Sequence, residues 1–156
     1  MYHRIVAARI RSAWRHLEDR DAAFVLDQFA AEFSYRFVGD HALGGDRRTR
    51  AAMEAWFARL FRLFPDARFS VSDVLVRGWP WATRAVALVT VDATMEAVGY
   101  RNEVVQTVDL RWGRITRVHT LEDTQKLARA LDALAARGIP EAGAAPITDQ
   151  PTPAMT

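Results

Sequence analysis

The sequence predicts an α+β fold in which one curved, mostly antiparallel sheet wraps around helices. Between residues 69 and 112, apolar and polar residues alternate through three successive stretches, FSVSDVLVRG, TRAVALVTVDATM and YRNEVVQTVDLRW, and GRITRVHTLED closes the run. Such alternation is typical of strands that turn one face to a core. Two helical segments, a short strand and a third helical segment precede this run, and a last helix follows it. This order favours a single sheet that curves around its helices.

Three segments before the run have the apolar spacing of helices. Residues 4–18 are expected to form an amphipathic helix, and residues 22–30 a short second helix with Asp21 as its N-cap. Residues 49–64 carry the strongest pattern. Its apolar positions, at steps of three and one, are Met53, Trp56, Phe57, Leu60, Phe61 and Phe64. Pro65 ends this helix, because proline has no amide hydrogen to donate and disfavours helix in the residue before it.

The remaining segments are a strand, a loop, a terminal helix and a tail. Residues 33–38 alternate and predict a strand, and the glycine-rich residues 39–45 predict a loop. The last helix is expected to begin after Asp123, which is its N-cap. Residues 138–156 are rich in Pro, Ala and Thr and have too little apolar surface to fold. We therefore expect one domain over residues 1–137, followed by a flexible C-terminal tail.

Composition and charge limit the class of protein. A chain of 156 residues suits one domain that buries about 70% of the surface its unfolded form exposes. The absence of cysteine excludes disulfides, thiolate metal sites and thiol nucleophiles. The 21 basic residues lie scattered among 19 acidic ones, so no nucleic-acid partner is expected. No apolar run reaches the roughly 18 residues of a membrane span, and the first residues lack the apolar core of a secretory signal. We expect a cytoplasmic protein without a membrane partner.

The alternation also predicts which strand faces line a pocket. In the second long strand, the odd positions of residues 85–93 are all apolar, so this face is expected to point inward. In the third long strand, the face with Tyr100, Asn102 and Gln106 is otherwise apolar, which suits a pocket with three uncharged polar groups. The pattern of the last strand allows either the side of Glu122 or the opposite side to face inward.

The loop GDHALGG leads into RAAMEAWFARLFRLFPDARFSVSDVLV, and the chain continues to the ending WGRITRVHTLEDTQKLARAL. This layout resembles the nuclear transport factor 2-like superfamily, in particular its SnoaL-like members, over about residues 4–136. The resemblance implies a cone in which a strongly bent sheet and three helices from the N-terminal half enclose a deep apolar pocket, with an additional C-terminal helix. It also turns the Glu122 side of the last strand inward. The superfamily includes ketosteroid isomerase, SnoaL-like polyketide cyclases, limonene epoxide hydrolase, scytalone dehydratase and non-catalytic binding or assembly modules.

The resemblance also tests individual mechanisms. Alignment with ketosteroid isomerase places Phe37 at the general base and Gln106 at the acid of the oxyanion hole, and an apolar ring cannot accept a proton. Alignment with limonene epoxide hydrolase places Thr120 at the carboxylate of the last strand. Neither mechanism is therefore expected, whereas a cyclase-type reaction needs only one acid/base group and a shaped apolar pocket. The available catalytic groups are Glu122, His41 and Asp40.

Each candidate residue has a plain structural alternative. His41 beside Asp40 suits either a base that a carboxylate orients or a solvated loop histidine. Glu122 is either a desolvated general acid with a raised pKa or a support for the start of the last helix near Asp123. The expected substrate-binding residues, which ordinary core packing also explains, are Trp14, Tyr35, Phe37, Trp56, Tyr100, Asn102, Gln106 and Thr120. The four histidines show no metal-ligand spacing, so neither a metal nor a cofactor is expected.

The sequence leads to two function hypotheses. The first is a cofactor-independent cyclase or isomerase that acts on an apolar cyclic ketone or polyketide-like substrate by acid/base chemistry. The second is a non-catalytic ligand-binding or assembly module of the same fold, because both isomerase carboxyls are missing. Both hypotheses imply a small apolar or aromatic ligand.

Two surface features concern assembly. Relatives of this fold dimerise through the outer face of the sheet, and a homodimer is expected here as well. The residues expected on that face are Thr90, Asp92, Thr107, Asp109 and Arg111, whose charges can pair across a two-fold axis. Trp79 and Trp81 flank Pro80 where polar residues are usual, and they are expected to cover the pocket entrance, join the dimer interface or close the sheet edge.

Overall fold

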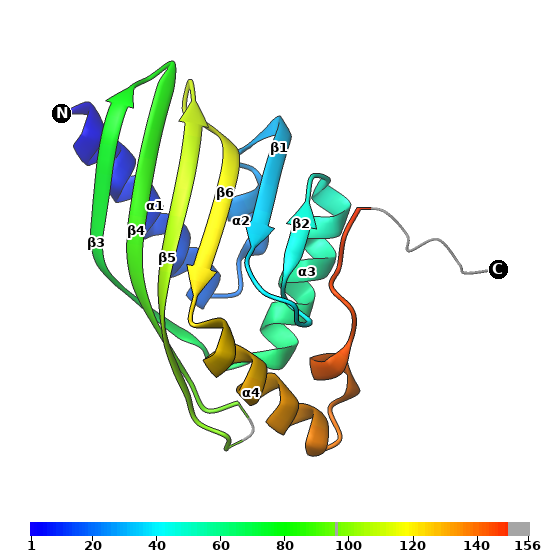
Figure 1. Cartoon of the computed structure of the whole chain (residues 1–156). Coiled ribbons are helices and arrows are strands. Elements are labelled where there is room, and N and C mark those ends of the chain that lie inside the picture. Colours follow the sequence, from blue (N-terminus) through cyan, green and yellow to red (C-terminus); the bar gives the residue numbers. More distant parts are fainter. Residues whose placement is uncertain (96, 150–156) are drawn as a thin grey trace.

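The computed structural model describes residues 1–95 and 97–149. The described residues form four α-helices, one 3-10 helix and a six-stranded sheet (Figure 1). In chain order the elements are α1 (Tyr2–Glu18), α2 (Ala22–Leu26), β1 (Phe29–Phe37), β2 (Gly45–Arg47), α3 (Arg50–Leu63), β3 (Arg68–Trp79), β4 (Ala82–Ala93), β5 (Tyr100–Arg111), β6 (Arg114–Glu122), α4 (Thr124–Ala136) and η1 (Pro140–Gly143). None of the described helices is both long enough and apolar enough to cross a membrane.

The sheet has the strand order β2-β1-β6-β5-β4-β3 and is antiparallel except where β1 pairs with β6. It curves around α1, and α4 follows β6 at one end of the sheet (Figure 1). This architecture confirms the α+β class with a curved, mostly antiparallel sheet wrapped around helices. The register places Phe37, Thr120 and Gln106 side by side on three adjacent strands. Residues far apart in the chain thereby meet on the concave face.

Burial along the strands follows the predicted alternation. In β4, the odd positions from Ala85 to Val91 are buried, and in β5 the buried side chains include Tyr100, Asn102 and Val104. In β6 the pattern changes phase, because Asp109 pairs with Arg117 while the next residue, Leu110, pairs with Ile115. This bulge turns both Ile115 and Val118 to the core. Because the bulge shifts the inward-facing positions from odd to even residue numbers, the alternation in the sequence does not show which side of this strand faces the core.

Three predicted boundaries in the first half of the chain are wrong. β1 begins at Phe29 rather than at residue 33, and the second helix ends at Leu26 rather than at residue 30. Pairing with β6 extends the strand, because Phe29 lies opposite Ile115 and the Ile115 amide donates to the Gln28 carbonyl at 2.9 Å. The predicted loop ends one residue early, because Gly45 is the first residue of β2, which pairs with β1. Long-range pairing decides all three features.

The segment after α4 also differs from the predicted flexible tail. Residues 139–149 pack along α3, with Ala142 buried and η1 formed at residues 140–143. Arg47 donates to the Ile147 carbonyl at 2.8 Å, and the Asp149 carboxylate accepts from the Thr49 amide at 3.0 Å, at the start of α3. Polar partners elsewhere in the chain therefore hold a segment with little apolar surface. Residues 150–156 of the predicted tail lie outside the described residues.

Candidate functional site

An apolar cavity lies between the concave face of the sheet and helices α1 and α3. Its volume is about 60 Å³, room for a few water molecules at roughly 10–15 Å³ each. The helices and β3 supply aromatic and aliphatic walls, whereas β1, β5 and β6 supply the polar groups. The sequence-predicted residues that line it are Trp14, Tyr35, Phe37, Trp56, Tyr100, Gln106, Thr120 and Glu122. The sequence predicts seven of these as substrate-binding residues and Glu122 as a catalytic group.

A second cavity of about 40 Å³ lies next to the first, further along the cone. The two cavities share five lining residues, Trp14, Leu17, Tyr35, Phe57 and Gln106. These shared residues therefore lie between the two cavities.

Glu122 is the one carboxyl group among the described residues that line the first cavity. Its Oε2 accepts a hydrogen bond from the Tyr100 hydroxyl at 3.3 Å, and its buried Oε1 has no partner among the described residues. Burial raises the pKa of Glu122 to about 7, the charge of Asp123 adds to this shift, and the Tyr100 hydrogen bond opposes it. At neutral pH this carboxyl group can therefore both accept and give a proton.

The N-terminus of α4 does not use Glu122 as a cap. The Asp123 carboxylate accepts from the amides of Gln125 and Lys126, both at 3.1 Å. This arrangement satisfies the helix start in the usual way. Asp123, not Glu122, therefore has the helix-supporting role.

Asn102 lies behind Tyr100, outside the cavity lining. Its side chain is 2% exposed, and its Nδ2 donates to the Tyr100 hydroxyl at 2.8 Å and to the Asp123 carbonyl at 3.0 Å. Burial and the nearby Glu122 raise the pKa of Tyr100 above its ordinary value, so this hydroxyl remains a donor. Asn102 orients Tyr100, and Tyr100 in turn contacts Glu122. Asn102, expected among the substrate-binding residues, thus does not line this cavity.

A group of polar side chains on three adjacent strands, Gln106, Thr120 and Tyr35, also lines the cavity. The Gln106 Nε2 donates to the Thr120 hydroxyl oxygen at 3.1 Å. Burial raises the pKa of Tyr35, and a hydrogen bond with Thr120 and the charge of Arg47 oppose this shift. The Gln106 amide carries a second hydrogen beyond the one used by Thr120. This group offers a ligand a neutral donor beside the ionisable Glu122.

Arg47 supports the aromatic wall from behind, and sequence reasoning missed it. It is fully buried, with its guanidinium 5.1 Å from the Trp56 ring centroid and 5.6 Å from that of Tyr35. It donates to the carbonyls of Gly44, Gly45 and Ile147 at 2.8 to 3.0 Å, and burial lowers its pKa. Only its place in the fold distinguishes it from the other arginines.

His41 and Asp40 lie outside the cavity lining. The His41 ring meets the edge of Phe37, its Nδ1 accepts from the Leu43 amide at 3.3 Å, and burial lowers its pKa. Asp40 is exposed, and the hydrogen bonds of the described residues include none between Asp40 and His41. The arrangement of a base oriented by its neighbour is therefore not formed here. His41 instead packs behind Phe37 and Leu43, two residues of the cavity wall.

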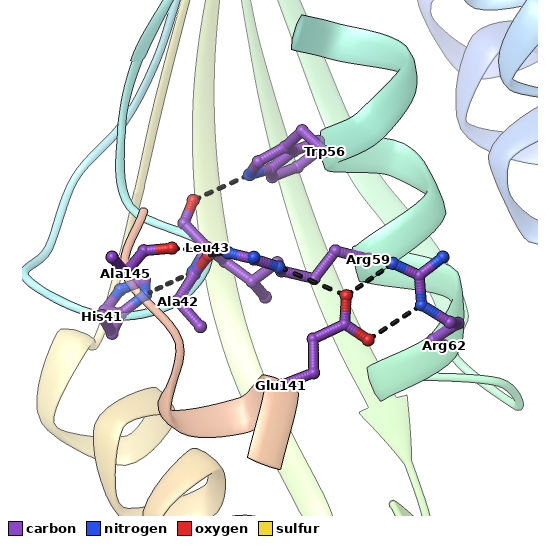
Figure 2. Close-up of polar contacts among 8 residues, drawn as sticks. All are labelled: His41, Ala42, Leu43, Trp56, Arg59, Arg62, Glu141 and Ala145. Atoms are coloured by element: carbon purple, nitrogen blue, oxygen red, sulfur yellow. Dashed lines mark hydrogen bonds and ion pairs between the residues drawn. The ribbon is translucent and has the colours of Figure 1, made fainter. Parts of the chain in front are cut away.

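The loop that carries Leu43 is held by α3 and by the C-terminal segment, as Figure 2 shows. Trp56 Nε1 donates to the Leu43 carbonyl at 2.8 Å. Arg59 Nη1 donates to the carbonyls of Ala42 at 2.8 Å and Ala145 at 2.7 Å, and Arg59 also pairs with Glu141. One arginine thereby joins the loop, α3 and the segment after α4.

Comparison with known proteins shows several solved structures of the same shape. The structure of TerC co-crystallized with polyporic acid matches with a TM-score of 0.68 and 19% identity, over 79% of this chain and 95% of that chain. AclR, a putative hydroxylase from Streptomyces galilaeus, matches with a TM-score of 0.62 and 14% identity, over 82% and 83%. An NTF2-like protein from Burkholderia xenovorans LB400 matches with a TM-score of 0.58 and 18% identity, over 78% and 91%. At such identities the likeness establishes the fold alone.

No curated protein sequence matches the chain significantly. The sequence profile of the SnoaL-like domain, in contrast, matches residues 10–118, which is more than half of the chain. This range runs from the middle of α1 into β6 and includes most of the cavity wall. The cone-shaped fold, shared with NTF2-like structures, agrees with that match. The chain belongs to the SnoaL-like domain family.

Proposed function

We propose that this SnoaL-like protein is a cofactor-independent enzyme of the cyclase or isomerase type. Its substrate is an apolar cyclic ketone or a polyketide-like molecule, and the chemistry is acid/base. The observation that carries the proposal is Glu122, a carboxyl group at the cavity wall whose burial raises its pKa to about 7. A general acid or base is most effective when its pKa lies near the working pH.

In the proposed reaction, ionised Glu122 removes a proton from a carbon next to a carbonyl group. In a cyclisation, that carbon forms a bond to a second carbonyl carbon, whose oxygen then takes the proton from Glu122. In an isomerisation, Glu122 returns the proton to a different carbon. Tyr100 holds the carboxyl group in place, and the free amide hydrogen of Gln106 donates to the oxygen on which charge develops.

The walls of the cavity support an apolar, cyclic substrate. Rings from Trp14, Phe37, Trp56 and Phe57 line it, and its polar groups lie on the sheet side. A planar substrate would therefore place its oxygen atoms toward β5 and β6. The volume of about 60 Å³ is smaller than such a substrate, so binding requires the side chains shared with the second cavity to move. A structure of similar fold, TerC, was co-crystallized with polyporic acid, which supports a ligand-binding role for this protein.

A non-catalytic binding module remains the second candidate. The observation that favours it is Phe37, an apolar ring at the position that resemblance to ketosteroid isomerase assigns to the general base. In addition, His41 and Asp40 lie outside the cavity lining, which leaves Glu122 without a second acid/base partner among the described lining residues. A pocket of this kind binds an apolar ligand without changing it.

Titration with a panel of aromatic ketones and steroids separates the two candidates. Trp14 and Trp56 line the cavity, so tryptophan fluorescence reports binding. Chromatography of the same mixtures reports product. The enzyme proposal expects both a fluorescence change and a new product for at least one compound. Binding without product across the panel would favour the binding module.

A further inference from the structure

Three tryptophans are exposed together at one end of the sheet. Trp79 and Trp81 stand at the turn between β3 and β4, and Trp112 stands at the turn between β5 and β6. Their exposed fractions are 64%, 53% and 69%. We call these three residues the tryptophan end. None of the three lines the apolar cavity, so the structure does not place them over the pocket.

The tryptophan end is a fixed arrangement. The rings of Trp79 and Trp81 are stacked, with centroids 6.1 Å apart and planes at 14°, and Trp112 lies 6.2 Å from Trp81. The Trp112 amide donates to the Pro80 carbonyl at 2.6 Å, which ties the two turns together. The backbone does not require tryptophan here. Trp112 has a φ of +50°, where asparagine or glycine is favoured and a bulky side chain is strained.

Positive charge lies beside the tryptophan end. A groove of about 720 Å³ on the outer face is lined by Trp81 and by Arg77, Arg84 and Arg111. Asp109 is the one acidic residue among the described residues that line it, and it pairs with Arg84 at 2.6 Å. Arg77 and Arg111 are exposed and form no ion pair within the described part of the chain. Two cations are thus available for an external anion.

We propose that the tryptophan end docks on the surface of a bilayer that contains anionic phospholipids. Tryptophan favours the membrane interface, because its ring is apolar and its N–H group is polar. Arginines near the surface attract anionic headgroups. The rings enter the headgroup region, and Arg77 and Arg111 meet the phosphates. Docking of this kind needs no membrane-spanning helix, so the lack of a long apolar run in the sequence does not bear on it.

Other occupants fit these observations less well. A single-stranded nucleic acid needs open ring faces for its bases, whereas Trp79 and Trp81 stack on each other. A second copy bound through the same end would bring the Arg77 and Arg111 side chains of both copies close together, and like charges repel. An anionic lipid surface satisfies both the rings and the arginines.

Sedimentation of the full chain with vesicles tests the proposal. We expect binding to vesicles of phosphatidylcholine mixed with phosphatidylglycerol and much weaker binding to phosphatidylcholine alone, with a blue shift of tryptophan emission and quenching by brominated lipid. The triple variant Trp79→Thr, Trp81→Ser, Trp112→Asn should lower the partition constant by roughly tenfold or more. Asn suits the positive φ at position 112, which keeps the turn intact.

Two further variants complete the test. The pair Arg77→Glu, Arg111→Glu should lower binding to anionic vesicles by roughly twentyfold or more, since each arginine near the surface contributes about fivefold. Arg129→Glu, which reverses an exposed charge on α4 at the other end of the sheet, should leave binding nearly unchanged. Failure to bind anionic vesicles, or equal binding by the triple variant, overturns the proposal. Loss of self-association in the triple variant without any vesicle binding would assign the tryptophan end to a contact between copies.

Discussion

The Glu122 carboxyl group lies at the wall of an apolar cavity, where burial destabilises its ionised form. Its Oε1 is buried with no partner among the described residues, and its Oε2 receives one hydrogen bond, from Tyr100. A purely structural carboxylate in a fold is usually paired or fully hydrogen-bonded. The incomplete pairing of Glu122 leaves one oxygen available to a ligand, which is what proton transfer requires.

The raised pKa of Glu122 predicts how stability depends on pH. In the unfolded chain the pKa takes its ordinary value of 4.5, and in the folded chain it is about 7. Unfolding therefore releases a proton between these values, and wild-type stability falls as the pH rises from about 4.5 to 7. Glu122→Gln removes this loss, so its free energy of unfolding should exceed that of wild type by about 3 kcal/mol above pH 7 and by little near pH 4.

Chemical denaturation at a series of pH values measures this difference. Glu103→Gln is a suitable control, because it makes the same change at an exposed carboxyl group of β5 outside the cavity lining. A constant difference between Glu122→Gln and wild type across this pH range would contradict the raised pKa.

The Tyr100 hydroxyl is expected to set the pKa of Glu122. Its hydrogen bond favours the ionised carboxylate and lowers that pKa. Tyr100→Phe removes the donor and should raise the pKa of Glu122 further above 7. Carbon-13 NMR of the glutamate side chains measures this titration. Tyr35→Phe, which changes the same cavity without removing a hydrogen bond to Glu122, should have a smaller effect, and a fall of the pKa in Tyr100→Phe would refute the assignment.

At the scale of elements, the structure assigns the C-terminal segment a part in the cavity wall. Figure 2 shows Arg59 between the loop of Leu43 and the segment of Glu141. The Leu43 side chain lines the cavity, and its carbonyl is bound by Trp56. Segments from three parts of the chain thereby hold one wall residue.

Two neighbouring arginines of α3 test this role. Arg59 is 12% exposed and binds the carbonyls of Ala42 and Ala145, whereas Arg62 is 59% exposed and pairs with Glu141. Arg59→Ala leaves two carbonyls without their donor and should cost about 2–3 kcal/mol of unfolding free energy. Arg62→Ala should cost much less, since exposed ion pairs contribute little. Urea denaturation compares them, and equal losses would mean that the contacts of Arg59 do not hold the loop.

The whole molecule shows which features a sequence pattern can predict. Alternation in β4 and β5 gave the inward faces because each strand has one buried side. Resemblance to the superfamily gave the cone and the inward Glu122. The bulge that turns Ile115 inward and the burial of Arg47 depend on partners in other strands and in the C-terminal segment. The place of Asn102 behind Tyr100, rather than in the cavity, depends on contacts that alternation alone does not encode.

Assembly is the next property of the whole molecule. Asp92 and Asp109, which the sequence suggested for pairing across a two-fold axis, pair with Arg101 and Arg84 of the same chain. The outer face of the sheet still exposes the apolar side chains Leu75, Val105 and Leu121. We therefore predict a homodimer that buries the part of this face around Val105 and Leu121, which leaves Arg77 and Arg111 beside the tryptophan end accessible.

Sedimentation equilibrium at micromolar concentration checks the dimer. Wild type should sediment at twice 17.6 kDa, and Val105→Arg should shift the protein toward the monomer, because it places a charge in the apolar contact. The control Glu32→Arg, an exposed residue of β1, should remain dimeric. A wild-type protein found only at 17.6 kDa would rule the dimer out.

The most direct measurement of the central claim is turnover by Glu122→Gln on a compound that wild type converts. Glutamine keeps the shape of the side chain but cannot take up or release the proton. We predict that Glu122→Gln binds the compound by tryptophan fluorescence and converts it roughly 10²–10⁴ times more slowly, while His41→Ala, changed outside the cavity lining, retains the wild-type rate. Wild-type turnover by Glu122→Gln would contradict the assignment of Glu122 as the acid/base group.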